Sequence, residues 1–149
     1  MKKLWVVCII VVLALTACGQ GGLPLNGAQF ATETYVKVWI SSWETHDAEK
    51  MLALYANDAT YMDYGANYGP IKKDALSTDI RKSFQEVDLG IKTSSYTITP
   101  DGRFAALEMT LTATDKNGKK VSIPGVVILE FKDGKVINET DYYNGTPLE

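Results

Sequence analysis

The chain has 149 residues, of which 46% are hydrophobic and 22% charged, and its 15 basic and 18 acidic side chains give a net charge of −3. This length and composition fit one globular domain and exclude a disordered, collagen-like or coiled-coil protein. The acidic balance gives no electrostatic reason to expect nucleic-acid binding. One histidine and two cysteines exclude the usual zinc sites and a disulfide framework. We expect no metal and no other cofactor.

Residues 1–18 contain no acidic side chain and have the pattern of a secretory signal peptide. Lys2 and Lys3 precede an apolar run, residues 4–15, that is too short to span a bilayer. Leu15-Thr16-Ala17-Cys18 follows and resembles the bacterial lipobox, in which the cysteine is lipidated and becomes the first residue of the mature protein. The alternative is an ordinary signal peptide with an incidental cysteine.

Lipidation of Cys18, for example with palmitate, would anchor the protein to a membrane of the bacterial cell envelope, with its domain outside the cytoplasm. The predicted boundaries are a signal peptide at 1–17, the lipidated cysteine and a flexible tether at 18–27, and a domain at 28–149. Cys8 leaves with the signal peptide, so the mature domain has no free thiol. Two basic residues leave as well, which changes the net charge from −3 to −5.

Hydrophobic periodicity predicts three helices and one short strand in the first half of the domain. The helices are expected at residues 28–45, 48–56 and 74–87, and the strand at residues 59–64. Asp47 is well placed to cap the second helix. A glycine-containing loop is expected between the strand and the third helix.

Three Asp-Gly or Asn-Gly pairs punctuate the second half, at residues 101–102, 117–118 and 133–134, and such pairs are the strongest short-range signal for two-residue hairpin turns. They predict a meander of four antiparallel strands. The segments between the turns are longer than ordinary strands, so we expect the sheet to bend, with a bulge at Pro124-Gly125. The predicted fold class is α+β: a cone-shaped, strongly curved antiparallel sheet with three helices filling its concave face.

Two-residue turns fix the register of the meander and so the side chains that share a face. In this register Met109 pairs with Val126, and Val126 pairs with Asp141. The face is mostly apolar but also carries Glu139 and Tyr143. A carboxyl group in such surroundings has a raised pKa, which a general acid or base needs at neutral pH. For Glu139, close to the turn, we favour a solvated position at the rim.

Two stretches resemble the SnoaL-like branch of the nuclear transport factor 2-like superfamily. The first runs from Trp43 to Thr60 and is followed by Asp63; the second runs from Phe131 to Ile137 and continues to Asp141-Tyr142-Tyr143. The resemblance covers residues 28–145 and implies the same cone. It says little about function, because the superfamily includes cyclases, isomerases, dehydratases, epoxide hydrolases and members that only bind or dimerise.

The resemblance also assigns possible roles to single residues. Asp63 matches the proton-shuttling aspartate of the ketosteroid isomerase relatives, and Asp141 matches the acid/base aspartate of SnoaL-type polyketide cyclases. The oxyanion-hole tyrosine of the isomerases falls on Trp39, and their protonated carboxylic acid falls on Val126 or Val127. Because valine cannot donate a hydrogen bond and an indole N–H is a different donor, steroid isomerase activity is not expected.

Three functions stay open, and we favour binding over catalysis. In the first, the tethered cone binds a small apolar or aromatic ligand, and its pocket is lined by Trp39, Tyr61, Met109, Val126 and Tyr143. In the second, a metal-free cyclase, isomerase or dehydratase uses Asp63 and Asp141 to shuttle protons on a carbonyl-containing substrate. In the third, a homodimer forms through the outer face of the sheet, which is expected to carry Thr110, Thr112, Ile123, Val127, Leu129, Thr140 and Tyr142.

Overall fold

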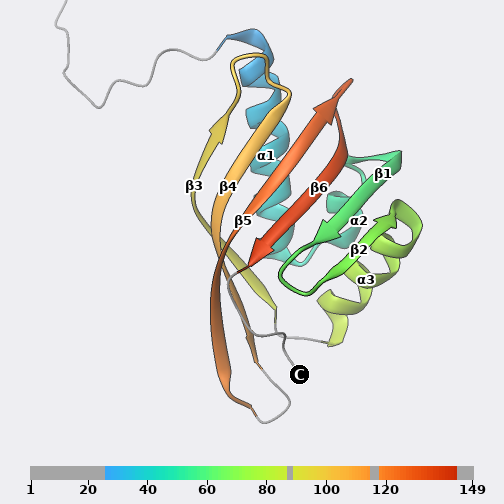
Figure 1. Cartoon of the computed structure of the whole chain (residues 1–149), viewed down its shortest axis with the longest axis vertical. Coiled ribbons are helices and arrows are strands. Elements are labelled where there is room, and N and C mark those ends of the chain that lie inside the picture. The colour runs from blue at the N-terminus through green and yellow to red at the C-terminus, as the bar shows by residue number, and fades with distance from the viewer. Residues whose placement is uncertain (1–25, 87–88, 115–117, 144–149) are drawn as a thin grey trace, which may run out of the picture.

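The computed structural model describes residues 26–86, 89–114 and 118–143. It contains a six-stranded sheet in the order β2-β1-β6-β5-β4-β3, with three helices on one face (Figure 1). The elements are α1 (Gly27–Thr45), α2 (Ala48–Leu52), β1 (Tyr55–Asp63), β2 (Tyr68–Lys72), α3 (Lys73–Glu86), β3 (Gly90–Ile98), β4 (Phe104–Thr114), β5 (Lys120–Lys132) and β6 (Lys135–Tyr143). The sheet curls around the helices without closing, which confirms the α+β cone expected from the sequence.

The signal peptide, Cys18 and most of the tether lie outside the described residues. Within the described part of the chain, no helix is long and apolar enough to cross a membrane. Helix α1 begins at the end of the predicted tether, where Asn26 forms a capping box with Gln29. It ends at His46, which has a left-handed backbone conformation.

The sheet is mixed, whereas the sequence predicted antiparallel pairing throughout. β1 pairs with β6 in parallel, and the other neighbouring pairs are antiparallel. Tyr68–Lys72, predicted as a loop, forms an additional edge strand beside β1. The second helix ends at Leu52, four residues earlier than predicted, and Tyr55 already begins β1. Tyr55 and Ala59 are both buried, and residues four apart share a face in a helix and in a strand alike. The spacing of the apolar residues therefore did not show where the helix ends and the strand begins.

β4 and β5 pair one residue away from the predicted register. Met109 lies opposite Gly125, and Val127 lies opposite Asp141. A shift of one residue moves side chains to the opposite face of a strand. Val126 therefore faces the outer side of the sheet, where it lies beside Tyr142. Three side chains predicted on the outer face belong to the inner face: Ile123, Val127 and Leu129.

The shift begins at the connection between β4 and β5. Thr114 pairs with Lys120, which leaves five residues between the strands where the Asn-Gly pair predicted a turn of two. From there the β4–β5 ladder continues without interruption to Phe104, so the described strands have no bulge at Pro124-Gly125 in this ladder. The register of β5 against β6 shifts between Glu130 and Phe131 instead.

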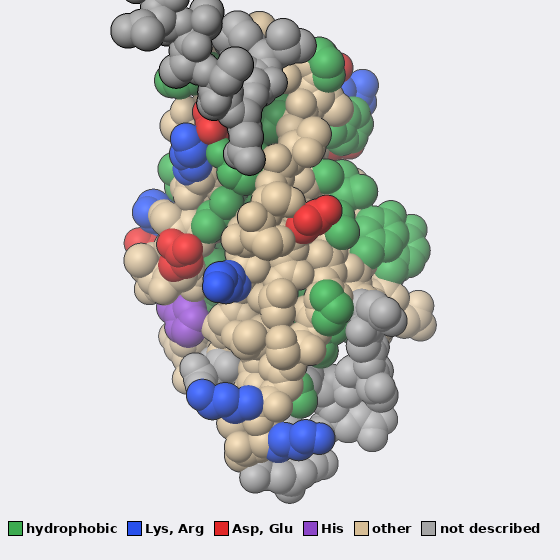
Figure 2. Space-filling model, turned by 90° about the vertical axis from the view of Figure 1, so that its left-hand side faces the viewer, with side chains coloured by type: hydrophobic (Ala, Val, Ile, Leu, Met, Phe, Trp, Pro, Cys, Tyr) green, Lys and Arg blue, Asp and Glu red, His purple; other side chains and the backbone are tan. Residues whose placement is uncertain are grey.

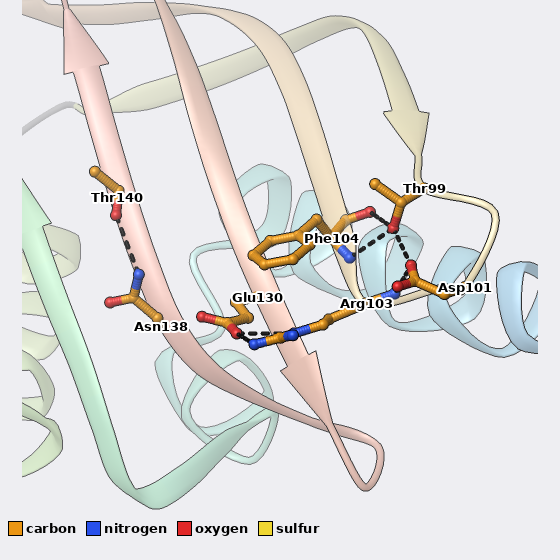
Figure 3. A network of polar contacts seen from close by, with 7 residues as sticks. All are labelled: Thr99, Asp101, Arg103, Phe104, Glu130, Asn138 and Thr140. Carbon is orange, nitrogen blue, oxygen red and sulfur yellow. Dashed lines mark hydrogen bonds and ion pairs between the residues drawn. The ribbon is translucent and has the colours of Figure 1, made fainter.

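The exposed side chains of the edge strand β3 are polar: Lys92, Ser94, Ser95 and Thr97. Figure 2 looks onto the β3 side of the molecule, which shows much tan surface, scattered charged groups and several hydrophobic groups. An edge strand of this kind resists pairing with other chains. The turn centred on residues 101–102 lies where it was predicted, but five residues rather than two separate β3 from β4. Beside this turn the Asp101 carboxylate accepts from the Thr99 hydroxyl at 2.6 Å, and Arg103 donates to Glu130 at 2.6 and 3.0 Å (Figure 3).

Candidate functional site

A cavity of about 520 Å³ lies between the helices and the inner face of the sheet. This volume falls within the range of about 300–1,000 Å³ that is typical of small-molecule sites. The apolar part of its wall comes from α1, α2, α3, the segment before β3, and β4: Trp43, Met51, Leu76, Ile80, Leu89 and Leu111. Leu76 and Ile80 are one helical turn apart and so point from the same face of α3.

Acidic and phenolic side chains from β1 and β6 form one polar part of the wall, and polar side chains of β2 and α3 form another. In the parallel pair of β1 and β6, Tyr61 lies opposite Glu139, and Asp63 lies opposite Asp141. Residues two apart on a strand share a face, so all four side chains point into the cavity, together with Tyr143. The structure therefore brings together the two aspartates that the sequence analysis singled out.

Asp141 is 5% exposed and has an incomplete set of hydrogen bonds. The hydroxyl groups of Tyr61 and Tyr143 each donate to its Oδ2 at 3.1 Å. Its Oδ1 is buried and has no partner among the described residues. Burial and, after it, the charge of Glu139 raise the pKa of Asp141 well above its ordinary value. A buried carboxyl oxygen without a hydrogen-bond partner is energetically costly.

Glu139 is 2% exposed, which contradicts the solvated rim position expected from the sequence. The Tyr55 hydroxyl donates to Glu139 Oε2, and the Trp39 indole N–H donates to the Tyr55 oxygen at 3.1 Å. Burial raises the pKa of Glu139 to about 7, although hydrogen bonds from Tyr55 and Trp39 act in the opposite direction. The prediction was wrong because β6 lies between β1 and β5, so position 139 is inside the sheet.

The phenols that face Asp141 keep their protons. Burial, followed by the charge of Asp141, raises the pKa of both Tyr61 and Tyr143 above the ordinary value. They therefore act as hydrogen-bond donors throughout the physiological pH range. Among the described residues, no group of three His, Cys, Asp or Glu side chains could hold a metal ion.

The sequence profile of the SnoaL-like domain family matches residues 36–139. The chain belongs to this family. The match confirms the resemblance found in the sequence. No curated protein matches the chain.

Solved structures share the SnoaL-like fold at low sequence identity. A putative polyketide cyclase from Xanthomonas campestris pv. campestris has a TM-score of 0.68 and 21% identity, over 78% of this chain and 93% of that one. A Mycobacterium tuberculosis protein in complex with estradiol-17β-hemisuccinate has a TM-score of 0.68 and 18% identity, over 76% and 94%. A Catenulispora acidiphila protein with a ketosteroid isomerase-like fold, in complex with trimethylamine, has a TM-score of 0.67 and 16% identity, over 76% and 88%. At such identities the likeness shows the fold alone.

Two of the five predicted pocket residues, Tyr61 and Tyr143, line the cavity of this SnoaL-like domain. Val126 does not, because the register shift places it on the outer face. Trp39 and Met109, at 0% and 3% exposure, belong to the hydrophobic core. On the first helix and on the strand that carries Met109, the sequence predicted the right face but not the residues that reach the cavity.

Trp43 is the aromatic side chain of α1 that reaches the cavity. It lies one helical turn after Trp39 and so on the same face of the helix. In the structure its ring contacts the rings of Trp39 and Phe84, with centroids 6.1 and 4.8 Å apart. Its Nε1 is buried and, like Asp141 Oδ1, has no partner in the part of the chain that the structure describes. Trp43 and Asp141, which both line the cavity, thus each have one buried polar atom that is unpaired among the described residues.

Proposed function

We propose that this SnoaL-like domain is a binding protein whose cavity takes a small ligand with an apolar or aromatic body and one polar group. The observation that carries the proposal is the unpaired Oδ1 of Asp141 in the wall of a cavity that also has a set of apolar side chains from the helices and β4. The apolar wall would stabilise the body of the ligand at about 25 cal/mol per Å² of buried apolar surface. The polar group would complete the hydrogen bonding of Asp141.

Two structural neighbours support a ligand-binding role, since they were solved with estradiol-17β-hemisuccinate and with trimethylamine. Neither compound is assigned to this chain. The cellular setting of the proposal comes from the sequence: a lipid on Cys18 would hold the domain at a membrane of the cell envelope, outside the cytoplasm.

Native mass spectrometry tests binding directly. The full chain is purified from its host in a nonionic detergent, and we expect a noncovalent adduct of small-molecule mass. Leu111→Trp would fill the cavity and should abolish the adduct. Its matched control is Thr112→Trp on the same strand, because Thr112 is exposed on the opposite face. Absence of the adduct from the wild type, or its retention in Leu111→Trp, would contradict the proposal.

Acid/base catalysis is the second candidate, and the position of Asp63 opposite Asp141 favours it. Asp63 as carboxylate would remove a proton from the carbon beside a carbonyl group, while protonated Asp141 would donate a hydrogen bond to the carbonyl oxygen. The retained compound, incubated with the protein in D₂O, would then exchange a carbon-bound hydrogen. Asp63→Asn should abolish this exchange without abolishing the adduct. A compound that binds and never exchanges would exclude this reaction for that ligand.

A further inference from the structure

The walls of the cavity combine acidic side chains with aromatic rings. The acidic groups are Asp63, Asp79, Glu139 and Asp141, and the described lining includes one basic residue, Lys82. The aromatic groups are Trp43, Tyr61, Tyr68 and Tyr143. Carboxylates attract positive charge, and so do the faces of aromatic rings through their quadrupole. This combination is suited to a cation that is partly stripped of water.

Asp141 provides a second and independent observation that points to a ligand. Its side chain is 5% exposed, it lines the cavity, and its Oδ1 has no partner within the described ranges. The other carboxyl oxygen accepts hydrogen bonds from two phenols. A carboxylate at this position would therefore have one oxygen held by two phenols and one buried oxygen that lacks a hydrogen-bond donor among the described residues.

We propose that the ligand is an organic ammonium ion, with its positively charged nitrogen against Asp141 Oδ1 and its apolar or aromatic body against the apolar wall of the cavity. This inference rests on the proposed binding function and names its ligand class. Metal cations do not fit this arrangement as well, because no described cluster of three ligating side chains meets there.

Binding of a cation should be coupled to proton release. Burial raises the pKa of Glu139 to about 7, and burial followed by the charge of Glu139 raises the pKa of Asp141 well above its ordinary value. A bound ammonium ion favours the ionised form, so one carboxylic acid gives its proton to the buffer and its carboxylate pairs with the cation. The affinity should then rise with pH, by at most about tenfold per pH unit for one proton.

The other titratable groups that face this pair are Tyr55, Tyr61 and Asp63 of β1, Tyr68 of β2, Asp79 and Lys82 of α3, and Tyr143 of β6.

Calorimetry with matched probes tests the inference on the full chain in nonionic detergent. Protonated 2-phenylethylamine and butylamine, which carry N–H donors, are compared with their neutral isosteres, 2-phenylethanol and butan-1-ol, at pH 6 and pH 8. We expect at least one ammonium probe to bind about tenfold or more tightly than its isostere at pH 8. The same probe should bind more weakly at pH 6. In buffers of different ionisation enthalpy, binding should release up to one proton.

Variants separate the charge of the cavity from the overall charge of the protein. Asp141→Asn keeps the shape and should remove the preference for the cation. Glu108→Gln removes one negative charge from the exposed outer face and should leave the preference unchanged. Equal binding of both members of each pair, or binding of neither ammonium probe, would overturn the ammonium inference. The proposed binding function fails on a different result, the absence of an adduct in native mass spectrometry.

Discussion

Asp63 and Asp141 lie directly opposite each other on the parallel strands β1 and β6, and both side chains line the cavity. The sequence suggested the two residues through likenesses to two different branches of one superfamily. The structure adds that they are neighbours, and that Tyr61 and Tyr143 hold one oxygen of Asp141 while the other stays unpaired among the described residues. Asp141 is therefore one of two buried carboxyl groups in the cavity wall, the other being Glu139.

Stability should decrease as the pH rises from about 5 to about 8. Burial raises the folded-state pKa of Glu139 from 4.5 to about 7, so between these values the folded protein holds a proton that the unfolded chain has lost. The stability from this proton is complete below the unfolded pKa and is lost as the pH rises through the folded pKa. We expect the free energy of unfolding in urea to fall by about 2–3 kcal/mol.

The variant Glu139→Gln is the control for this pH dependence and should flatten it, leaving the part due to Asp141. Measurements stay above pH 5 because Asp101 acts with the opposite sign. Hydrogen bonds from the Thr99 hydroxyl and the Arg103 N–H lower the pKa of Asp101, so its stabilisation is lost as the pH falls through that lowered value. Equal stability of the wild type at pH 5 and pH 8 would show that Glu139 is not held protonated.

Tyr55→Phe should destabilise the domain by about 1–3 kcal/mol, because it removes the hydroxyl group that joins Trp39 to Glu139. Both partners are buried and would lose a hydrogen bond. Urea unfolding at pH 7 measures the effect. Tyr142→Phe is the control, since that side chain is 46% exposed, and its stability should change by less than about 0.5 kcal/mol. Similar losses in the two variants would contradict a structural role for the Tyr55 hydroxyl.

Gly125→Ala should disturb the ligand site by displacing Tyr143. A Cβ atom at position 125 would lie 2.7 Å from Tyr143 Cδ1 and 2.8 Å from the Tyr142 carbonyl oxygen. The Tyr143 ring must then move, and its hydrogen bond to Asp141 should weaken. We expect a loss of stability of about 1–3 kcal/mol and a smaller fraction of ligand adduct.

The comparison for this prediction is Gly27→Ala, since a Cβ atom at position 27 meets no described atom within 4 Å. Gly27 begins α1, where alanine is neutral or stabilising. If the two variants have the same stability and the same fraction of ligand adduct, the position of the Tyr143 ring does not depend on the absence of a side chain at position 125.

The lipid anchor is tested by metabolic labelling with palmitate. Wild-type protein should be labelled, and Cys18→Ala should not, because Cys18 is the residue that the lipobox motif assigns to acylation. Cys8→Ala, in the apolar run of the signal peptide, is the matched control and should be labelled like the wild type. Label that persists in Cys18→Ala would place the lipid elsewhere.

Local signals in the sequence predicted the helices and the positions of the turns, because caps, periodicity and Asp-Gly pairs act over a few residues. The parallel pairing of β1 with β6 has no such signal, since it joins segments from the two ends of the domain. That pairing buries Glu139, which was therefore misjudged. The predicted register of β5 against β4 was wrong because the connection between these strands is longer than the two residues that the Asn-Gly pair indicates. The shift places Val126 on the outer face instead of in the pocket. The homodimer through that outer face stays a prediction.

The most direct test of the binding function is a crystal structure of the protein purified from its host together with the compound it retains. Electron density for a small molecule should fill the cavity beside Trp43, with a polar atom of the ligand within hydrogen-bonding distance of Asp141 Oδ1. An empty cavity, or a compound bound on the outer face of the sheet, would contradict the account.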